Sequence, residues 1–309
     1  MRAIVSAELG AGPTLTEVDT PTAGPGEVRV KVHTSSLNGF DTAVVSGWMA
    51  QYLEHRFPVT LGRDFAGTVD EVGAGVEGLA PGAVVFGVVL GYPLQAGGFG
   101  EYLVVPAATV AQVPDGLDLS VAGVLGLAGS AATTMLDTVA PRTGELLLIS
   151  GATGGVGSIA IQLGVARGAA VLATAAPGAE TDHVRALGAQ HVIDYTADVA
   201  AQVRAIAPNG VDIALHLAGD PLALADLVSA GGRFASLLGV GPDQMGDRDV
   251  VAYSVTAALA PSQWDELAAH VVAGRLAIPV QRTYRLDEVP QAFADFAGGT
   301  VGKLAVRIG

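Results

Sequence analysis

Three glycines with a spacing of three, Gly151, Gly154 and Gly157, are the strongest chemical signal in the sequence. Four apolar residues precede them, and apolar residues at helical spacing follow until Gly168. The pattern predicts a buried parallel strand, a tight turn and a helix. Such a turn lets backbone N–H groups and the positive helix N-terminus approach a pyrophosphate, while the missing Cβ of Gly157 allows close helix packing. The stretch therefore predicts a dinucleotide site.

A second chemically suggestive stretch, residues 35–64, places polar groups among aromatic ones, a composition typical of a pocket. Asn38, Asp41, Tyr52 and Asp64 could line a cleft, and the first three are the candidate catalytic residues. Two of them also have a structural interpretation, because Asp41 can cap a short helix from Thr42 and Asn38 can serve a turn. The sequence leaves both interpretations open.

The residues after the next expected strand bear on the choice between NAD and NADP. About twenty residues after Gly154 the sequence reads Thr174-Ala175-Ala176-Pro177-Gly178, without the carboxylate that NAD sites use to bind a ribose 2′-hydroxyl. This absence predicts NADPH. His183 and Arg185 are the nearest cations, although Arg185 can equally be a solvated helix charge.

The elements that position these residues form two regions of different texture. Short β-segments separated by Gly and Pro turns dominate at first, at residues 2–6, 27–34, 65–72, 83–89 and 101–105. From residue 120, helices alternate with six strands, the number in a doubly wound dinucleotide domain. The strands are expected at 146–149, 171–174, 191–193, 211–217, 233–238 and 250–255, and the helices at 120–127, 130–139, 180–187, 197–206, 221–229 and 262–273. Residues 278–309 return to the first texture.

Composition narrows the class of protein. The 309 residues are half apolar, which permits a large core, and the absence of cysteine excludes disulfides, thiol catalysis and cysteine-ligated zinc. A net charge of −14 disfavours nucleic acid and anionic membranes as partners. The N-terminal residues do not read as a secretory signal, and no run of membrane-spanning hydrophobicity is expected. A soluble cytoplasmic protein follows as the expectation.

Taken together, six segments resemble the medium-chain dehydrogenase/reductases, and within them the zinc-free quinone oxidoreductase (zeta-crystallin-like) branch. They are SLNGFD at 36–41, PVTLGRDFAGTVDEVG at 58–73, GGFGEYLVVP at 97–106, SGATGGVGSIAIQL at 150–163, ALGAQHVIDY at 186–195 and GKLAVRI at 302–308. The resemblance covers nearly the whole chain. It implies an α/β protein with a GroES-like β-rich substrate domain, a doubly wound six-stranded parallel Rossmann domain and a cofactor in the cleft between them. The expected boundaries are 1–119 and 276–309 for the GroES-like domain and 120–275 for the Rossmann domain.

The motif and the resemblance together give an expected set of cofactor contacts. Tyr195 matches a tyrosine that contacts the 2′-phosphate in the family, whereas the family's usual lysine is replaced near Glu180. The expected set is Gly151, Ala152, Thr153, Gly154, Gly155, Val156, Gly157, Thr174, Ala175, His183, Arg185, Tyr195, Leu217, Ala218, Leu238, Gly239 and Lys303.

Several positions depart from patterns in this family. Zinc-dependent relatives carry an early cysteine ligand and a G-H-E motif, where this chain has Asn38 and Gly62-Arg63-Asp64, so no catalytic metal is expected. Ala43 stands where quinone reductases often have tyrosine, and Gly129-Ser130-Ala131 replaces a G-L-T segment. His216, between leucines on an expected strand, is interpreted as a satisfied buried histidine. Substrate preference therefore cannot be inherited from the family.

The resulting hypothesis is an NADPH-dependent, metal-free reductase of quinones or α,β-unsaturated carbonyls. Asn38 is the candidate oxyanion donor, and the proton comes from solvent or from a tyrosine such as Tyr52 or Tyr92. A homodimer joined through the strand at 250–255 is expected. The alternatives are a noncatalytic NADPH-binding protein with a structural or sensing role, and a pathway-specific enoyl reductase.

Overall fold

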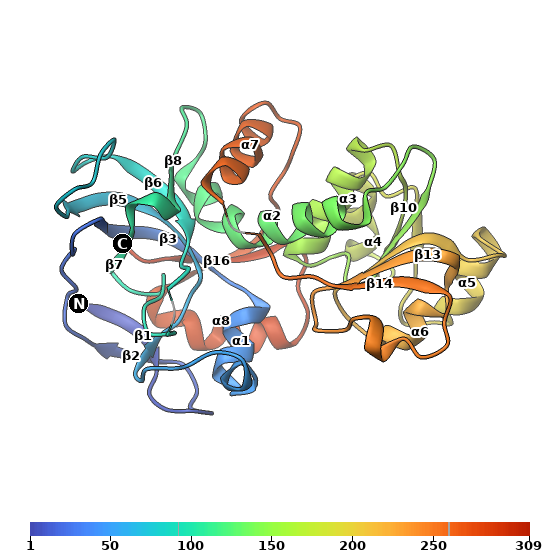
Figure 1. Ribbon diagram of the computed structural model, residues 1–309, viewed down its shortest axis with the longest axis horizontal. Helices are drawn as coiled ribbons and strands as arrows, with labels where there is room; N and C mark the ends of the chain where they lie inside the picture. Colours follow the sequence, from blue (N-terminus) through green and yellow to red (C-terminus); the bar gives the residue numbers. More distant parts are fainter. Residues whose placement is uncertain (92, 259) are drawn as a thin grey trace. The chain divides into compact units, whose positions relative to one another are not determined.

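The computed structural model describes residues 1–91, 93–258 and 260–309, and they form two compact units. Unit 1 comprises residues 1–128 and the described residues from 260 to 309, and unit 2 comprises residues 129–258. Both termini lie in unit 1 (Figure 1). The division differs from the expected boundaries at residues 119 and 275, because residues 120–128 and the helix α7 (Pro261–Val272) group with unit 1. Helix α7 packs there against strand β8.

Unit 1 is built mainly on antiparallel strands, and its β15–β16 pair is parallel. A seven-stranded sheet has the order β15-β16-β3-β5-β6-β8, with β7 also paired to β3, and a smaller sheet has the order β2-β1-β4. The strands are β1 (Arg2–Ser6), β2 (Thr14–Glu17), β3 (Glu27–Leu37), β4 (Val59–Thr60), β5 (Asp64–Val72), β6 (Val84–Val88), β7 (Tyr102–Pro106), β8 (Val110–Gln112), β15 (Val280–Arg285) and β16 (Lys303–Arg307).

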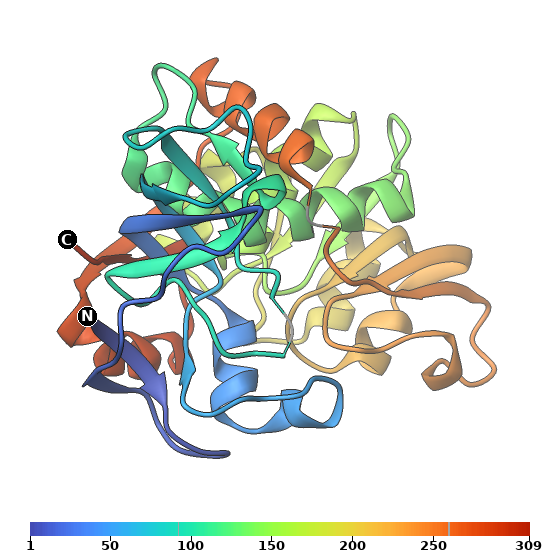
Figure 2. The same ribbon diagram turned by 60° about the vertical axis from the view of Figure 1, so that its left-hand side comes forward.

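The core of unit 1 lies along its central strands. Val28, Val30 and Val32 alternate inward along β3, as expected for a half-buried strand. The neighbouring strand β5 approaches so closely that a Cβ on Gly67 would lie 2.1 Å from the carbonyl oxygen of Lys31. Helices α1 (Gly39–Val45) and α8 (Val289–Ala297) lie on one side of this unit, and α7 lies on the opposite side (Figures 1 and 2).

The C-terminal segment returns to the first part of the chain. Strand β16 pairs antiparallel with β3, and the register sets Leu304 opposite Leu37. The pairing places Lys303 beside the end of β3, where the polar stretch that contains Asn38 begins. Residues that are far apart in the sequence therefore lie close together in the structure.

Unit 2 is a doubly wound sheet of six parallel strands with the order β11-β10-β9-β12-β13-β14. The strands are β9 (Leu146–Ile149), β10 (Ala170–Thr174), β11 (His191–Ile193), β12 (Val211–His216), β13 (Val228–Ser236) and β14 (Val250–Ser254). The helices are α3 (Gly155–Ala166), α4 (Ala179–Ala186), α5 (Val199–Ile206) and α6 (Pro221–Ala225). The predicted fold class is confirmed.

Helix α2 (Leu119–Val139) corrects two predictions. It is one continuous helix where two helices at 120–127 and 130–139 were expected, because Ala128, Gly129 and Ser130 continue its hydrogen bonding. Its length and mean hydropathy of 1.6 would suit a membrane span, which was not expected from the sequence. In this structure 67% of that apolar window is buried within the protein, as in a core helix.

The segment after β12 also differs from the prediction of a helix at 221–229. Asp220 caps α6 by accepting hydrogen bonds from Leu222 and Ala223, but the helix ends at Ala225. Strand β13 then starts at Val228, which pairs with Val211. Pairing with a buried neighbour strand therefore overrides the local helical pattern.

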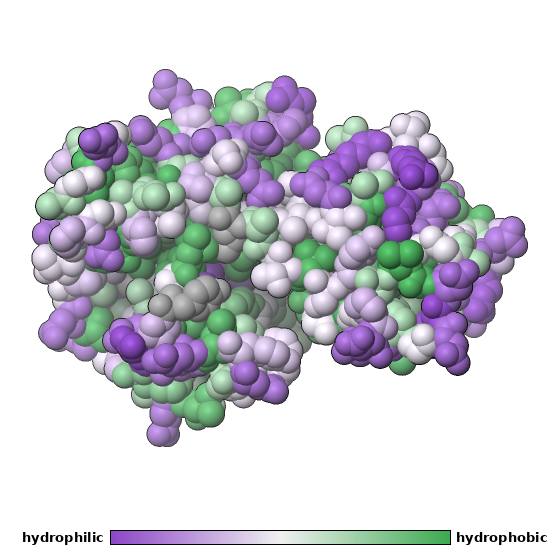
Figure 3. Space-filling view, in the orientation of Figure 1, coloured by the Kyte–Doolittle hydropathy of each residue, from purple (hydrophilic) through white to green (hydrophobic). Residues whose placement is uncertain are grey.

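Hydrophilic and hydrophobic residues alternate in small groups across the face of the molecule shown in Figure 3.

Candidate functional site

The glycine turn of unit 2 has the close contacts that its sequence predicts. Gly151 adopts a φ of +65°, and a Cβ there would lie 3.0 Å from the Cβ of Ala218. A Cβ on Gly157 would lie 2.5 Å from the carbonyl oxygen of Gly151, so only glycine lets α3 sit this close to the turn. Among the described residues, the first-turn amides of Gly155, Val156 and Gly157 have no hydrogen-bond acceptor. They can bind an anionic group at this end of the helix.

Hydrogen bonds join the turn to the ends of the neighbouring strands. The amide of Gly151 donates to Thr174 Oγ1 at 3.1 Å, and the amide of Leu217 donates to Ser150 Oγ at 3.2 Å. Buried Ala152 and Ala175 fill the space at the strand ends. The structure thus brings together the expected residues Gly151 to Gly157, Thr174, Ala175, Leu217 and Ala218. It places Leu238 and Gly239 directly after β13, on the same carboxyl edge of the sheet.

His216 has the structural role predicted for it. Its Nδ1 lies 2.9 Å from Ser236 Oγ, and its Nε2 lies 3.1 Å from the carbonyl oxygen of Gly219. Both ring nitrogens are therefore paired, and the ring stacks on Phe234. It is a satisfied buried histidine.

Glu180 makes the contact at this edge that sequence reasoning missed. Its side chain returns from α4 to the end of β10, where Oε2 accepts the N–H of Ala176 at 2.8 Å. Its Oε1 accepts the hydroxyl of Tyr195 at 3.0 Å. This hydrogen bond to the carboxylate raises the pKa of the Tyr195 hydroxyl. The expected residue Tyr195 is thus half exposed and engaged with a carboxylate.

The two expected cations of α4 have different surroundings. His183 Nε2 lies 2.8 Å from Ser158 Oγ, whose hydroxyl donates to the carbonyl oxygen of Thr153 at 3.1 Å. Burial lowers the pKa of His183, more than the nearby Glu180 carboxylate raises it. His183 is therefore an uncharged donor to Ser158 at neutral pH. Arg185 is exposed and stands five residues after Glu180, which is roughly 140° around the helix axis.

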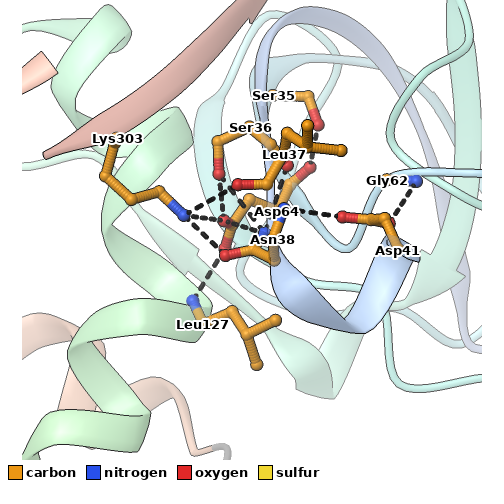
Figure 4. Close-up of polar contacts among 9 residues, drawn as sticks. All are labelled: Ser35, Ser36, Leu37, Asn38, Asp41, Gly62, Asp64, Leu127 and Lys303. Carbon is orange, nitrogen blue, oxygen red and sulfur yellow. Dashed lines mark hydrogen bonds and ion pairs between the residues drawn. The ribbon is translucent and has the colours of Figure 1, made fainter. Parts of the chain in front are cut away.

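Unit 1 contains a buried polar cluster around Lys303 (Figure 4). The ammonium of Lys303 donates to Asn38 Oδ1 at 2.5 Å and lies 3.5 Å from Asp64 Oδ2. The side chains of Lys303 and Asp64 are only 4% and 1% exposed, so solvent screens this ion pair little. Burial lowers the pKa of Lys303, and the carboxylates of Asp64 and Asp41 raise it in the opposite direction. Lys303 thus lies within the cluster of unit 1, whereas the sequence grouped it with the cofactor contacts.

Asp64 is the acceptor on which this cluster converges. Its carboxylate accepts hydrogen bonds from the Ser36 hydroxyl, from Asn38 Nδ2 at 3.0 Å and from the amide of Leu127 at 2.7 Å. Asn38 Nδ2 also donates to the carbonyl oxygen of Ser36 at 3.1 Å. Both ends of the Asn38 amide are therefore engaged within the protein. Asn38 would have to exchange one of these partners to act as the oxyanion donor expected from the sequence.

The structural interpretation of Asp41 accounts for its contacts. Its two carboxylate oxygens accept hydrogen bonds from the amides of Asn38 and Gly62, both at 2.9 Å, which caps α1 and ties it to the segment between β4 and β5. The helix begins at Gly39, earlier than the expected Thr42. Burial raises the pKa of Asp41 to about 6, although these two hydrogen bonds oppose the rise.

Tyr52 does not extend this cluster. Tyr52 is 63% exposed, and its ring packs against Trp48 with 5.0 Å between the ring centroids. Tyr92 lies outside the described residues. The structure therefore brings together Asn38, Asp41, Asp64 and Lys303, and it leaves Tyr52 at the surface.

The residues do not fit a catalytic zinc ion. Across residues 1–91, 93–258 and 260–309, no three His, Cys, Asp or Glu side chains lie close enough together to hold a metal. At the positions that resemble those of the metal-binding motifs, the ammonium of Lys303 already lies between Asn38 and Asp64. A metal cation there would be repelled by the ammonium.

Comparisons with known proteins agree with this architecture. The alcohol dehydrogenase GroES-like domain family matches residues 24–115, and the zinc-binding dehydrogenase family matches residues 187–306. A quinone oxidoreductase from Sus scrofa is 29% identical over 316 residues, which cover 94% of this chain and 92% of that protein. The structure of the quinone oxidoreductase from Coxiella burnetii superposes with a TM-score of 0.89 at 27% identity, covering 100% of this chain and 99% of the other.

A further relative is a much larger protein. A mycocerosic acid synthase-like polyketide synthase from Mycobacterium tuberculosis is 36% identical over 219 residues, or 69% of this chain. The matched part spans only 10% of the synthase. From the two family matches, the full-length likeness to quinone oxidoreductases and the doubly wound sheet, the chain belongs to the medium-chain dehydrogenase/reductase superfamily, whose Rossmann fold implies a nicotinamide-cofactor site.

Proposed function

We propose that this protein is a metal-free reductase that transfers a hydride to a quinone or an α,β-unsaturated carbonyl. The observation that carries the proposal is the Lys303 ammonium between Asn38 and Asp64, a built-in cation at the positions that resemble the metal-binding motifs. A conjugated acceptor is already electron-poor, so hydride addition does not require a metal to polarise it. The full-length likeness to quinone oxidoreductases supports the same reaction class.

Unit 2 provides the nucleotide site. A bound nicotinamide cofactor supplies the hydride. The free amides of Gly155, Val156 and Gly157 bind the pyrophosphate, and the close packing at Gly151 and Gly157 keeps the turn rigid. Thr174, Ala175, Leu217, Ala218, Leu238 and Gly239 border this nucleotide site on the same edge of the sheet.

The acceptor is assigned to the buried cluster of unit 1. Hydride addition to a quinone or enone leaves negative charge on an oxygen atom. The Lys303 ammonium stabilises this charge electrostatically in its low-dielectric surroundings, while Asn38 and Asp64 hold the ammonium in place. The proton then comes from solvent or from an exposed hydroxyl such as that of Tyr52.

The choice between NADPH and NADH depends on the charges at the end of β10. The expectation of NADPH depends on the absence of a carboxylate after Thr174, but the carboxylate of Glu180 lies at Ala176 in the structure. The sequence therefore shows no carboxylate directly after Thr174, but the structure places one there, and the prediction of NADPH did not take it into account. Both reduced cofactors carry the same hydride, so the proposed reaction does not depend on which of them is used.

A second candidate is an enoyl reductase that serves one biosynthetic pathway. The 36% identity to part of a polyketide synthase favours it, and its chemistry is the same reduction of a conjugated carbonyl. Small-molecule acceptors, a cytoplasmic location and a homodimer belong to both versions of the proposal.

The test is oxidation of NADH and NADPH against a panel of quinones, enones and enoyl thioesters. Turnover of quinones and simple enones supports the general reductase, and turnover of thioesters alone supports the pathway enzyme. Cofactor binding without turnover of any acceptor would support the noncatalytic alternative and overturn the proposal.

A further inference from the structure

The carboxylate of Glu180 occupies the end of β10, although the residue belongs to the first turn of α4. Two hydrogen bonds, from the Ala176 amide at 2.8 Å and the Tyr195 hydroxyl at 3.0 Å, fix its position. In Rossmann domains this is where an acidic residue binds the ribose 2′-hydroxyl of NAD. A carboxylate offers about four lone-pair sites, so two remain for a ligand after these contacts.

The surroundings of Glu180 are poor in the positive charge that a 2′-phosphate requires. His183 is uncharged at neutral pH, because burial lowers its pKa, and its Nε2 pairs with Ser158. Arg185 projects from another side of α4, roughly 140° away from Glu180 around the axis. Asp194 is a second carboxylate close enough to affect Tyr195. Electrostatics at this edge therefore disfavour a dianionic phosphate.

Tyr195 was expected to contact the 2′-phosphate, but in the structure its hydroxyl has another partner. Its hydroxyl proton is directed to Glu180 Oε1 at 3.0 Å, so the hydroxyl is not available as a donor to a phosphate. The hydrogen bond instead orients the carboxylate. Glu180 and Tyr195 thus form a hydrogen-bonded pair, in which Tyr195 is the positioning residue.

We propose that Glu180 makes NADH the preferred cofactor, by accepting hydrogen bonds from the adenosine ribose hydroxyls and repelling a 2′-phosphate. The inference rests on the proposed function, because it concerns the nucleotide site of the same enzyme. It replaces the expectation of NADPH that the sequence alone supports.

The experiment measures direct binding, without turnover. Isothermal titration calorimetry compares NADH with NADPH, and ADP-ribose with its 2′-phosphorylated form, in the wild type, Glu180→Gln and Glu180→Lys. The wild type is expected to bind the forms without the 2′-phosphate roughly ten- to a hundredfold more tightly, as hydrogen bonds to a charged group imply. Glu180→Gln is expected to reduce the ratio of the two affinities, and Glu180→Lys is expected to make the 2′-phosphorylated forms bind more tightly.

Three further variants serve as controls. Asp182→Lys makes the same charge change on an exposed residue of the same helical turn, and it is expected to shift the ratio far less than Glu180→Lys. Tyr195→Phe frees the carboxylate and weakens NADH binding without improving that of NADPH. Gly157→Ala weakens both forms equally, because its Cβ would meet the carbonyl oxygen of Gly151 at 2.5 Å.

The outcomes separate this inference from the proposed function. Equal affinity for the two forms, or tighter binding of NADPH by the wild type, overturns the role of Glu180 and leaves the reductase intact. A shift in Glu180→Lys no larger than that in Asp182→Lys also overturns it. Failure of the wild type to bind either cofactor overturns the proposed function itself.

Discussion

The ammonium of Lys303 lies 2.5 Å from the side-chain oxygen of Asn38, although 265 residues separate the two along the chain. The contact forms because β16 pairs with β3, and it completes a buried cluster that also includes Asp64. The sequence places these residues in separate motifs. Their meeting shows that one strand pairing assembles the charged centre of unit 1.

Removal of the Lys303 ammonium is expected to destabilise unit 1 strongly. Lys303→Met leaves Asp64 buried without its cation, which costs about 3–5 kcal/mol of unfolding free energy. The double variant Asp64→Asn with Lys303→Met should recover part of this loss. Denaturant unfolding measures both effects. Lys31→Met, at an exposed position of β3, is the control and should change stability by less than about 0.5 kcal/mol. Equal effects of the two lysine variants would contradict the assigned ion pair.

Asp41 should make stability depend on pH between about 4 and 6. Its folded pKa of about 6 lies above the unfolded value, so its stabilising contribution is fully present below the unfolded pKa and is lost as pH rises through 6. The unfolding free energy of the wild type, relative to Asp41→Asn, should therefore increase by roughly 2 kcal/mol from pH 7 to pH 4. Urea titrations of both proteins across this range measure it. A constant difference would show that Asp41 titrates normally.

Chelation should leave the activity intact. Because the described residues offer no three-ligand metal site and Lys303 supplies a cation, exhaustive EDTA treatment is expected to leave kcat and KM unchanged. Metal analysis of the purified protein accompanies the assay. Stoichiometric zinc, with activity lost on its removal and restored on its return, would contradict the metal-free proposal.

The edge strand β14 is expected to mediate a homodimer. It pairs with β13 on one side, and Val251 on it is 48% exposed, so its other edge can pair with a second copy. Light scattering at micromolar concentration should give a dimeric mass, and Val251→Lys should reduce it to that of a monomer. Val272→Lys, at a similarly exposed position of α7, is the control that should remain dimeric. A monomeric wild type would refute the prediction.

The sequence predicted the parts of the fold that local patterns determine. Apolar runs such as Leu146–Ile149 and the glycines after them indicate buried parallel strands and a nucleotide turn, and their alternation with helices predicted a doubly wound sheet of six strands. The helix predicted at 221–229 begins at Pro221 but ends at Ala225, because Val228 belongs to a strand fixed by pairing with Val211. Pairing of this kind depends on contacts distant in sequence, which local propensity does not contain.

The site was less predictable for a related reason. Glu180 follows Thr174 by a few residues and was noted as lying near the place of the family's usual lysine, but its sequence position does not show that the side chain folds back to Ala176. The partnership of Lys303 with Asp64 spans 239 residues and no motif contains both. Asn38, Asp41 and Asp64 were predicted from one polar stretch, and the structure places them in one buried cluster, but the contacts with Lys303 could be identified only in three dimensions.

The pairing of β16 with β3 also affects the order in which the two units can fold during synthesis. Asp64 leaves the ribosome long before residue 303 is made, so the nascent unit 1 carries a carboxylate whose cation has yet to be synthesised. Residues 129–258, by contrast, form a continuous unit whose six strands are all available earlier. During translation, unit 2 can therefore reach its native state first. Unit 1 can complete its fold only after β16 has been synthesised, although most of its residues precede unit 2 in the chain.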